Sequence, residues 1–162
     1  MIDEIDTIIL NILQTNARTS NAEIARQVDL APSAVFERIR KLEERGVIQG
    51  YSASIRPKAI GLPLLAFIFV RADEKPGTEK TAHRVAEIPE VLEVHHVAGE
   101  DCFLVKVRAA DTDALHKLLS ERLGRIETIT STRTTIVLET VKESSGLPIA
   151  APAEVQPETV RV

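Results

Sequence analysis

Three short helical segments separated by tight turns occupy the first 46 residues, and they restrict the fold more than any other feature. Apolar residues recur every three or four positions over residues 3–15, which predicts an amphipathic helix. The pattern Ser-x-x-Glu that begins at Ser20 is a capping box and predicts a second, short helix. Pro32 suits the first position of a third helix, which Gly46 would end. Three short helices joined by such turns are typical of a helix-turn-helix.

The third segment carries a polar face opposite an apolar one formed by Val35, Ile39 and Leu42. In a helix-turn-helix, the outward face of this helix enters the major groove of DNA. Ser33 and Glu37 are then predicted to meet base edges, and the basic side chains to hold phosphates or read guanine. The predicted DNA contacts are Ser33, Ala34, Glu37, Arg38, Arg40, Lys41 and Arg45.

Periodicity alone leaves an alternative open for these residues. A plain three-helix bundle with a solvated charged face would show the same pattern, and Arg38 could then pair with a local carboxylate such as Glu43. Phe36 lies beside the apolar face, so we expect it to be partly buried rather than to contact a thymine methyl group.

Net charge does not decide between these interpretations. The chain carries a formal charge of −4, and residues 1–56 hold seven Lys/Arg against eight Asp/Glu. Four of those seven basic residues lie between Arg38 and Arg45, however, and phosphate contact is local because salt screens charges beyond about 8–10 Å. The charge therefore neither supports nor excludes DNA as the partner.

The hydrophobic pattern changes after Gly46. Residues 47–55 are turn-punctuated and β-leaning, as a wing or linker strand would be. Beyond a proline-containing boundary the order is strand, helix, strand, strand, helix, strand, and the last strand is predicted over residues 126–141. This βαββαβ order is ferredoxin-like, so the predicted fold class is α+β. The predicted parts are a helix-turn-helix domain over 1–56, a linker over 57–63, a βαββαβ domain over 64–142 and a flexible tail over 143–162.

Several classes of protein are disfavoured by composition and motifs. The single cysteine, Cys102, can form neither an internal disulfide nor a cysteine-based zinc site, and the four histidines lack metal-ligand spacing, so no metal or cofactor is expected. No phosphate loop, nucleophile elbow or paired-carboxylate motif favours an enzyme. No apolar run approaches the roughly 18–20 residues of a membrane span. The acidic N-terminus is unlike a signal peptide, and we expect a cytoplasmic protein.

Two polar stretches in the second half are candidates for binding a small molecule. Gly99-Glu100-Asp101 forms a turn between two apolar strands, and hydroxyl side chains fill the last strand. Backbone N–H groups at the turn could bind the carboxylate of a zwitterion, with Asp101 pairing with its ammonium group. An ordinary β-turn and a threonine-rich edge strand explain the same residues, and the pattern leaves both interpretations open.

Motifs along residues 2–142 resemble those of the leucine-responsive and asparagine regulator family, Lrp/AsnC. Each match is weak alone, but their order and spacing together are specific. The matching stretches are Asp6–Leu10, Asn16–Ser20, Ser33–Val35, Arg38–Ile39, Leu42–Glu43, Gly46–Tyr51, Pro89–Val91, Gly99–Val107 and Thr132–Leu138.

The resemblance implies a winged helix-turn-helix followed by an effector-binding and oligomerisation domain. Proteins of this family are regulators of amino-acid metabolism genes; they pair into homodimers, often assemble into octamers, and sense an amino acid bound between effector domains. The implied partners are double-stranded DNA and an amino acid or similar effector. The implied effector contacts, with the neighbouring turn residue included, are Gly99, Glu100, Asp101, Thr132 and Thr134.

Two positions depart from the family pattern. Ala31 stands where a serine usually caps the recognition helix, which would weaken that cap by about 1 kcal/mol. Cys102 stands where the family places an aspartate, so Asp101 is displaced by one residue from the expected ammonium ligand. A rival interpretation is a small-molecule-binding assembly protein whose N-terminal bundle contacts protein, although such a surface would not require the basic cluster between Arg38 and Arg45.

Overall fold

The computed structural model describes residues 2–74, 78–99 and 101–150. These residues divide into two units: an N-terminal unit of residues 2–53 with 143–150, and a sheet unit of residues 54–142. Within the described ranges, no helix is long and apolar enough to cross a bilayer.

Side-chain caps begin the first two of three helices in the N-terminal unit, α1 (Glu4–Thr15), α2 (Asn21–Val28) and α3 (Pro32–Glu44). The Asp3 carboxylate accepts from the Asp6 N–H at 2.8 Å, and the Asp6 carboxylate accepts from the Asp3 N–H at 3.4 Å, which completes a capping box. This box was not anticipated.

The capping box predicted at Ser20 is only half formed. The Ser20 hydroxyl accepts from the Glu23 N–H, but the Glu23 carboxylate bonds Arg26 and Gln27 on the next turn. Helix α3 begins without any side-chain cap, as expected from Ala31, and Pro32 opens it with a φ angle that is already helical.

One apolar core joins the three helices. Ile9 of α1, Ile24 of α2, and Val35 and Leu42 of α3 are all essentially inaccessible to solvent. Because Val35 and Leu42 are buried, the opposite side of α3 faces outward. The helix ends at Glu44, and Gly46, which follows the C-cap residue Arg45, has a φ of +67° in the left-handed region that glycine adopts without strain.

The short strand predicted after Gly46 does not form. Val47 and Ile48 donate their N–H groups to the Leu42 carbonyl, and Ile48 packs on the helical core. Residues 47–55 pair with no strand, so this connection is irregular rather than a β wing.

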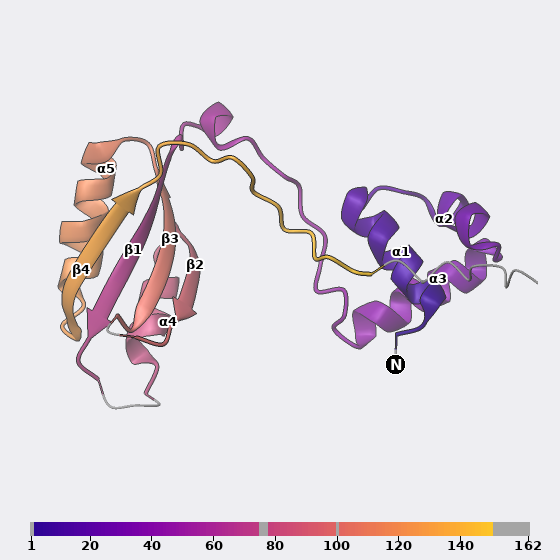
Figure 1. The fold of residues 1–162 in the computed structure, drawn as a ribbon, viewed down its shortest axis with the longest axis horizontal. Coiled ribbons are helices and arrows are strands. Elements are labelled where there is room, and N and C mark those ends of the chain that lie inside the picture. Colours follow the sequence, from indigo (N-terminus) through magenta and orange to yellow (C-terminus); the bar gives the residue numbers. More distant parts are fainter. Residues whose placement is uncertain (1, 75–77, 100, 151–162) are drawn as a thin grey trace, which may run out of the picture. The chain divides into compact units, whose positions relative to one another are not determined.

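The sheet unit has the predicted βαββαβ order (Figure 1). Its four antiparallel strands lie in the order β2-β3-β1-β4, the ferredoxin-like arrangement. The last strand is shorter at both ends than the predicted residues 126–141: Ile126 is a buried loop residue before it, and residues 137–141 lie beyond its end. The elements are β1 (Leu64–Ala72), α4 (Lys80–Ala86), β2 (Val91–His96), β3 (Phe103–Ala109), α5 (Thr112–Lys117), a π-helical turn (Leu118–Arg122), a 3-10 turn (Leu123–Arg125) and β4 (Ile129–Ile136), after a 3-10 turn at Pro57–Ile60.

Both helices cover the same face of the sheet. Alternate residues of β1 and β3, such as Ile68 and Val105, are fully buried against Val85 of α4 and Leu115 of α5. The other face, which we call the open face, carries the intervening side chains and includes the partly accessible Phe69.

A buried hydroxyl links α4 to the segment after β1 and to the loop before β4. The Thr81 side chain is fully buried; its Oγ1 lies 2.9 Å from Glu74 Oε2 and 2.7 Å from Thr128 Oγ1.

We expect Thr81→Val to lower the free energy of unfolding by about 1–3 kcal/mol, because Glu74 and Thr128 lose a partner in a site without free access to water. Urea titration measures this change. Thr81→Ser keeps the hydroxyl and is the matched control; an equal loss in both variants would mean that the methyl group, not the hydrogen bonds, matters.

Candidate nucleic-acid and effector sites

The outward side of α3 forms the candidate DNA-binding surface. Ser33, Glu37, Arg40 and Lys41 are exposed along it, and Ala34 is half-buried at its margin. Ser33, Glu37 and Arg40 follow one another at spacings of four and three residues, and Lys41 lies four residues after Glu37, which places them on one side of the helix. We call the set Ser33, Phe36, Glu37, Arg40, Lys41 and Glu44 the recognition face.

Acidic neighbours offset the arginine at the centre of the recognition face. Arg40 donates to Glu37 at 2.7 Å and to Glu44 at 2.5 Å. The hydrogen bond from Arg40 lowers the pKa of Glu37, and the hydrogen bond to Glu37 raises the pKa of Arg40. Such exposed pairs contribute little to stability, but they preset the direction of the guanidinium group.

Lys41 and Arg45 continue the basic side of α3. Lys41 is exposed and forms no ion pair with any residue that the structure describes. Arg45 is the exposed C-cap residue, and its N–H donates to the Lys41 carbonyl. A lysine ammonium without a fixed partner can move toward a phosphate without first breaking a salt bridge.

Arg38 has a different position from the other predicted DNA contacts. One guanidinium nitrogen donates to Asp3 Oδ2 and to Asp6 Oδ1, each at 2.7 Å, and both carboxylates belong to the capping box of α1. Hydrogen bonds to Asp3 and Asp6 raise the pKa of Arg38. The backbone N–H of Asp6, followed by Arg38, lowers the pKa of Asp3. Arg38 therefore joins α3 to the start of α1, and its carboxylate partners are not the Glu43 considered from the sequence.

This junction yields a pH-dependent prediction. We expect Arg38→Gln to lower the free energy of unfolding by about 1.5–3 kcal/mol near neutral pH, the range for hydrogen bonds to charged groups. Because the folded pKa of Asp3 lies below its ordinary value of 3.8, that carboxylate stabilises the fold above pH 3.8 and stops doing so as pH falls through the folded pKa. The difference between Arg38→Gln and the unmodified chain should thus narrow in acid.

Urea titrations at neutral pH and near pH 3 measure the effect. Arg26→Gln is the matched control, since Arg26 pairs with Glu23 on an exposed helix surface and its loss should stay within about 0.5 kcal/mol. A loss for Arg38→Gln as small as that of the control would show that the junction does not stabilise the unit.

Two aromatic side chains near α3, Phe36 and Tyr51, are exposed. Phe36 is 53% exposed on the recognition face, although it was expected to be partly buried. Its distances of three residues from Ser33 and four from Arg40 were the signal for an outward position.

Tyr51 donates its hydroxyl to Glu43 at 2.9 Å, and partial burial and this carboxylate raise the pKa of Tyr51 to about 12. Tyr51 thereby connects the chain after α3 to the helix.

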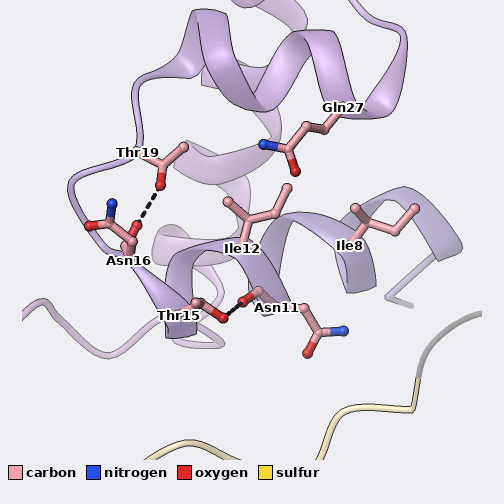
Figure 2. Close-up of a pocket in the computed structure, with 7 residues that line it drawn as sticks. All are labelled: Ile8, Asn11, Ile12, Thr15, Asn16, Thr19 and Gln27. Carbon is pink, nitrogen blue, oxygen red and sulfur yellow. Dashed lines mark hydrogen bonds between the residues drawn. The ribbon is translucent and has the colours of Figure 1, made fainter.

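A shallow groove of about 470 Å³ lies between α1 and α2 (Figure 2). Its floor includes the half-buried Ile8 and Ile12, and Gln27 of α2 lies at the opposite side. None of its lining residues belongs to α3, so the groove is separate from the recognition face. The residues are Ile8, Asn11, Ile12, Thr15, Asn16, Thr19 and Gln27.

The predicted effector residues fall into two groups in the sheet unit. Asp101, in the turn between β2 and β3, accepts from Arg133 of β4 at 3.0 Å. The Arg133 guanidinium also lies 3.9 Å from the centre of the Phe69 ring. Arg133 was not predicted, although it is the one cation within the threonine-rich stretch. Glu100, also predicted, lies outside the described residues.

Thr132 and Thr134 point away from this ion pair. In the register of β1 and β4, Thr132 opposes Val70 and Thr134 opposes Ile68, whose side chains face the helices. Directly paired residues share a face of the sheet, so both threonines lie on the helical side and Arg133 lies on the open face. Strand β4 therefore carries the two groups of candidate residues on its opposite faces.

The turn itself is held by backbone bonds. Gly99 has a φ of +140°, a conformation that favours glycine. The Cys102 N–H donates to the Val70 carbonyl, and the Cys102 Sγ lies 3.5 Å from both the N and O of Ala72. The thiol therefore packs against the end of β1, so Asp101 and not residue 102 supplies the carboxylate near the open face.

Both parts of the chain match known families. Residues 2–49 match the family model described as winged helix-turn-helix DNA-binding, and residues 65–147 match the model of the Lrp/AsnC ligand binding domain. The chain is 39% identical to the leucine-responsive regulatory proteins of Klebsiella pneumoniae and Escherichia coli K12 over 150 residues, which cover 91% of this chain and 92% of each relative. The chain belongs to the Lrp/AsnC family.

Solved structures of the Lrp/AsnC family have the same architecture. AsnC of Escherichia coli superposes with a TM-score of 0.83 at 30% identity, covering 90% of this chain and 97% of that one. A transcriptional regulator of Neisseria meningitidis in complex with L-methionine gives 0.85 at 31% identity, covering 91% and 97%. The feast or famine regulatory protein of Mycobacterium tuberculosis, complexed with L-methionine, gives 0.85 at 36% identity, covering 93% and 100%.

These findings confirm the family resemblance and the α+β fold predicted from sequence. The homologues are transcriptional regulators and not enzymes, and this Lrp/AsnC chain is a DNA-binding transcriptional regulator with a ligand-binding domain.

Proposed function

We propose that this Lrp/AsnC protein is a cytoplasmic regulator of amino-acid metabolism genes that binds pseudo-palindromic DNA as a homodimer or octamer. The observation that carries the proposal is the recognition face: α3 buries Val35 and Leu42 and presents its polar and basic side chains outward. A dimer would supply one such helix to each half-site. The match to a DNA-binding family model over residues 2–49 supports this role.

The proposed contacts on α3 divide by chemistry. Ser33 and Glu37 would meet base edges, with Glu37 accepting from a cytosine amine. Lys41 and Arg45 would hold phosphates, and Arg40 would either hold a phosphate or read guanine. Arg40 must first exchange Glu37 and Glu44 for its DNA partner, and this exchange favours sites where the released Glu37 finds a base donor. Arg38, with two protein partners, contributes chiefly by fixing α3.

The proposal predicts different effects for the two basic residues. Lys41→Ala should weaken DNA binding and reduce the slope of log affinity against log salt by about 0.9, the value for one lost phosphate contact. Arg40→Ala should weaken binding more, because it also leaves the carboxylates of Glu37 and Glu44 without their cation. Fluorescence anisotropy with DNA from the protein's own upstream region, at several salt concentrations, measures both.

Lys117→Ala removes an exposed lysine of the sheet unit and is the matched control. Light scattering should give the same oligomer mass for all three variants. Equal affinities for Lys41→Ala, Arg40→Ala and the control would place the DNA contacts elsewhere.

We infer that an amino acid is the effector and that it binds near the turn at Gly99–Asp101. Two similar regulators have been crystallised with L-methionine. The Asp101–Arg133 pair offers one group of each sign, which suits the ammonium and carboxylate of a zwitterion. Thr132 and Thr134 remain candidates on the helical side of β4, where hydroxyl groups could reach a ligand at the strand edge.

Ligand-induced stabilisation tests this inference. An effector present at 100 times its Kd should raise the free energy of unfolding by about 2.7 kcal/mol. We expect at least one of the twenty amino acids, L-methionine among them, to shift the thermal transition of the unmodified protein. Asp101→Asn should abolish most of that shift because it removes the carboxylate that lies beside Arg133 at this turn and could pair with the ligand's ammonium group.

Asp113→Asn, at an exposed position in the first turn of α5, is the matched control and should keep the full shift. A shift that survives unchanged in Asp101→Asn would move the effector site away from this turn.

The open face of the sheet supports the proposed homodimer. Phe67, Phe69 and Leu104 lie on it next to one another in the strand register and remain partly accessible. Glu93 and Lys106, which form an ion pair at 3.0 Å, lie beside them. An apolar centre with a charged margin is the usual composition of a protein interface.

A further inference from the structure

The side chain of Gln14 on α1 forms two hydrogen bonds with one residue near the C-terminus. Gln14 Oε1 accepts from the Leu147 N–H at 2.6 Å, and Gln14 Nε2 donates to the Leu147 carbonyl at 3.2 Å. A carboxamide that satisfies both backbone groups of one residue imitates a neighbouring β-strand. The contact therefore recognises an extended backbone and not a particular side chain, which agrees with the 72% exposure of Leu147.

The residues around Leu147 favour the extended backbone that this contact requires. Pro148 follows it, and the residue before a proline is restricted to extended conformations. The Ile149 N–H donates to the same Leu147 carbonyl at 2.9 Å, which bends the chain around Pro148. The Gly146 N–H donates to Ser144 Oγ at 3.2 Å. Hydrogen bonds thus hold the backbone in place on both sides of Leu147, independently of the Leu147 side chain.

This contact changes how the two units are connected. The chain leaves the N-terminal unit after Ala53, forms the sheet unit, and rejoins the N-terminal unit from Glu143 onward. The first connection runs through residues 54–63, and the second runs through residues 137–142 after β4. We propose that Ser144–Ile149 is a docking segment that binds α1 through Gln14 and so gives the DNA-binding unit a second attachment to its effector unit.

The second attachment limits the freedom of the recognition helix. A unit held by a single irregular connection samples many orientations, and only a fraction of them fit two half-sites at once. Docking of Ser144–Ile149 reduces those orientations before DNA arrives. Thr132, Arg133 and Thr134 lie on β4, and the chain continues from β4 into the docking segment. The docking segment therefore also connects these candidate effector residues to α1 by the shortest path along the chain.

Four variants of the full chain test the docking directly. Gln14→Ala removes the carboxamide that bonds to both backbone groups of Leu147, and Leu147→Pro removes the N–H donor of that residue. Leu147→Ala keeps both backbone groups and is the matched control for the second variant. Asn11→Ala is the matched control for the first, because Asn11 lies one turn earlier on α1 (Figure 2) and its side chain forms no hydrogen bond among the described residues.

Hydrogen-exchange mass spectrometry of peptides covering residues 137–150 gives the result without DNA. We expect Gln14→Ala and Leu147→Pro to exchange about ten-fold faster than the unmodified chain, the factor that corresponds to about 1.4 kcal/mol. Both controls should exchange like the unmodified chain. Equal exchange in Gln14→Ala and Asn11→Ala would overturn the docking, whatever the protein does on DNA.

The consequence for orientation rests on the proposed function and has its own readout. In DNA titrations, Gln14→Ala should bind about three- to ten-fold more weakly than Asn11→Ala at equal oligomer mass, because fewer molecules hold the competent arrangement. Faster exchange with unchanged DNA affinity would refute the second attachment as a restraint. Failure of every chain, including the unmodified one, to bind DNA would instead count against the proposed function.

Discussion

The double ion pair of Arg38 with Asp3 and Asp6 is the contact on which the N-terminal unit depends. It joins the capping box of α1 to the side of α3, and Asp6 is almost buried there. A buried carboxylate without its cation is costly, so α3 is held in one rotational setting relative to α1. That setting turns Val35 and Leu42 inward and the recognition face outward. Arg38, which was predicted to contact DNA, thereby positions the recognition face.

Ion pairs of this kind also explain how an acidic regulator can present a DNA-binding surface. Four carboxylates on or beside α3 are engaged with arginines: Asp3 and Asp6 with Arg38, and Glu37 and Glu44 with Arg40. Each pair reduces the local negative field that phosphates would meet, although the chain as a whole carries −4. Net charge is therefore a poor guide here, because what DNA meets is the arrangement of a few side chains within a Debye length.

Prediction succeeded where one periodic pattern decides the outcome. The three helices, the βαββαβ order and the family resemblance all follow from short-range patterns, and the structure and the relatives confirm them. It was wrong where two patterns compete: residues 47–55 have β propensity but find no strand to pair with, and Phe36 next to the apolar stripe points outward. The site residues for DNA and effector remain predictions, since position alone does not show binding.

The sequence by itself determined that the first 46 residues form three short helices with a polar outer face on the third, because helical periodicity and turn residues are local properties. Only the tertiary structure decided the use of each charge and hydroxyl on that scaffold. Arg38 pairs with carboxylates more than thirty positions away in the sequence. Asp101 pairs with Arg133 across the sheet, and Gln14 forms hydrogen bonds with Leu147 near the other end of the chain. No local pattern encodes such pairs, since they exist only once folding has brought distant segments within hydrogen-bond distance.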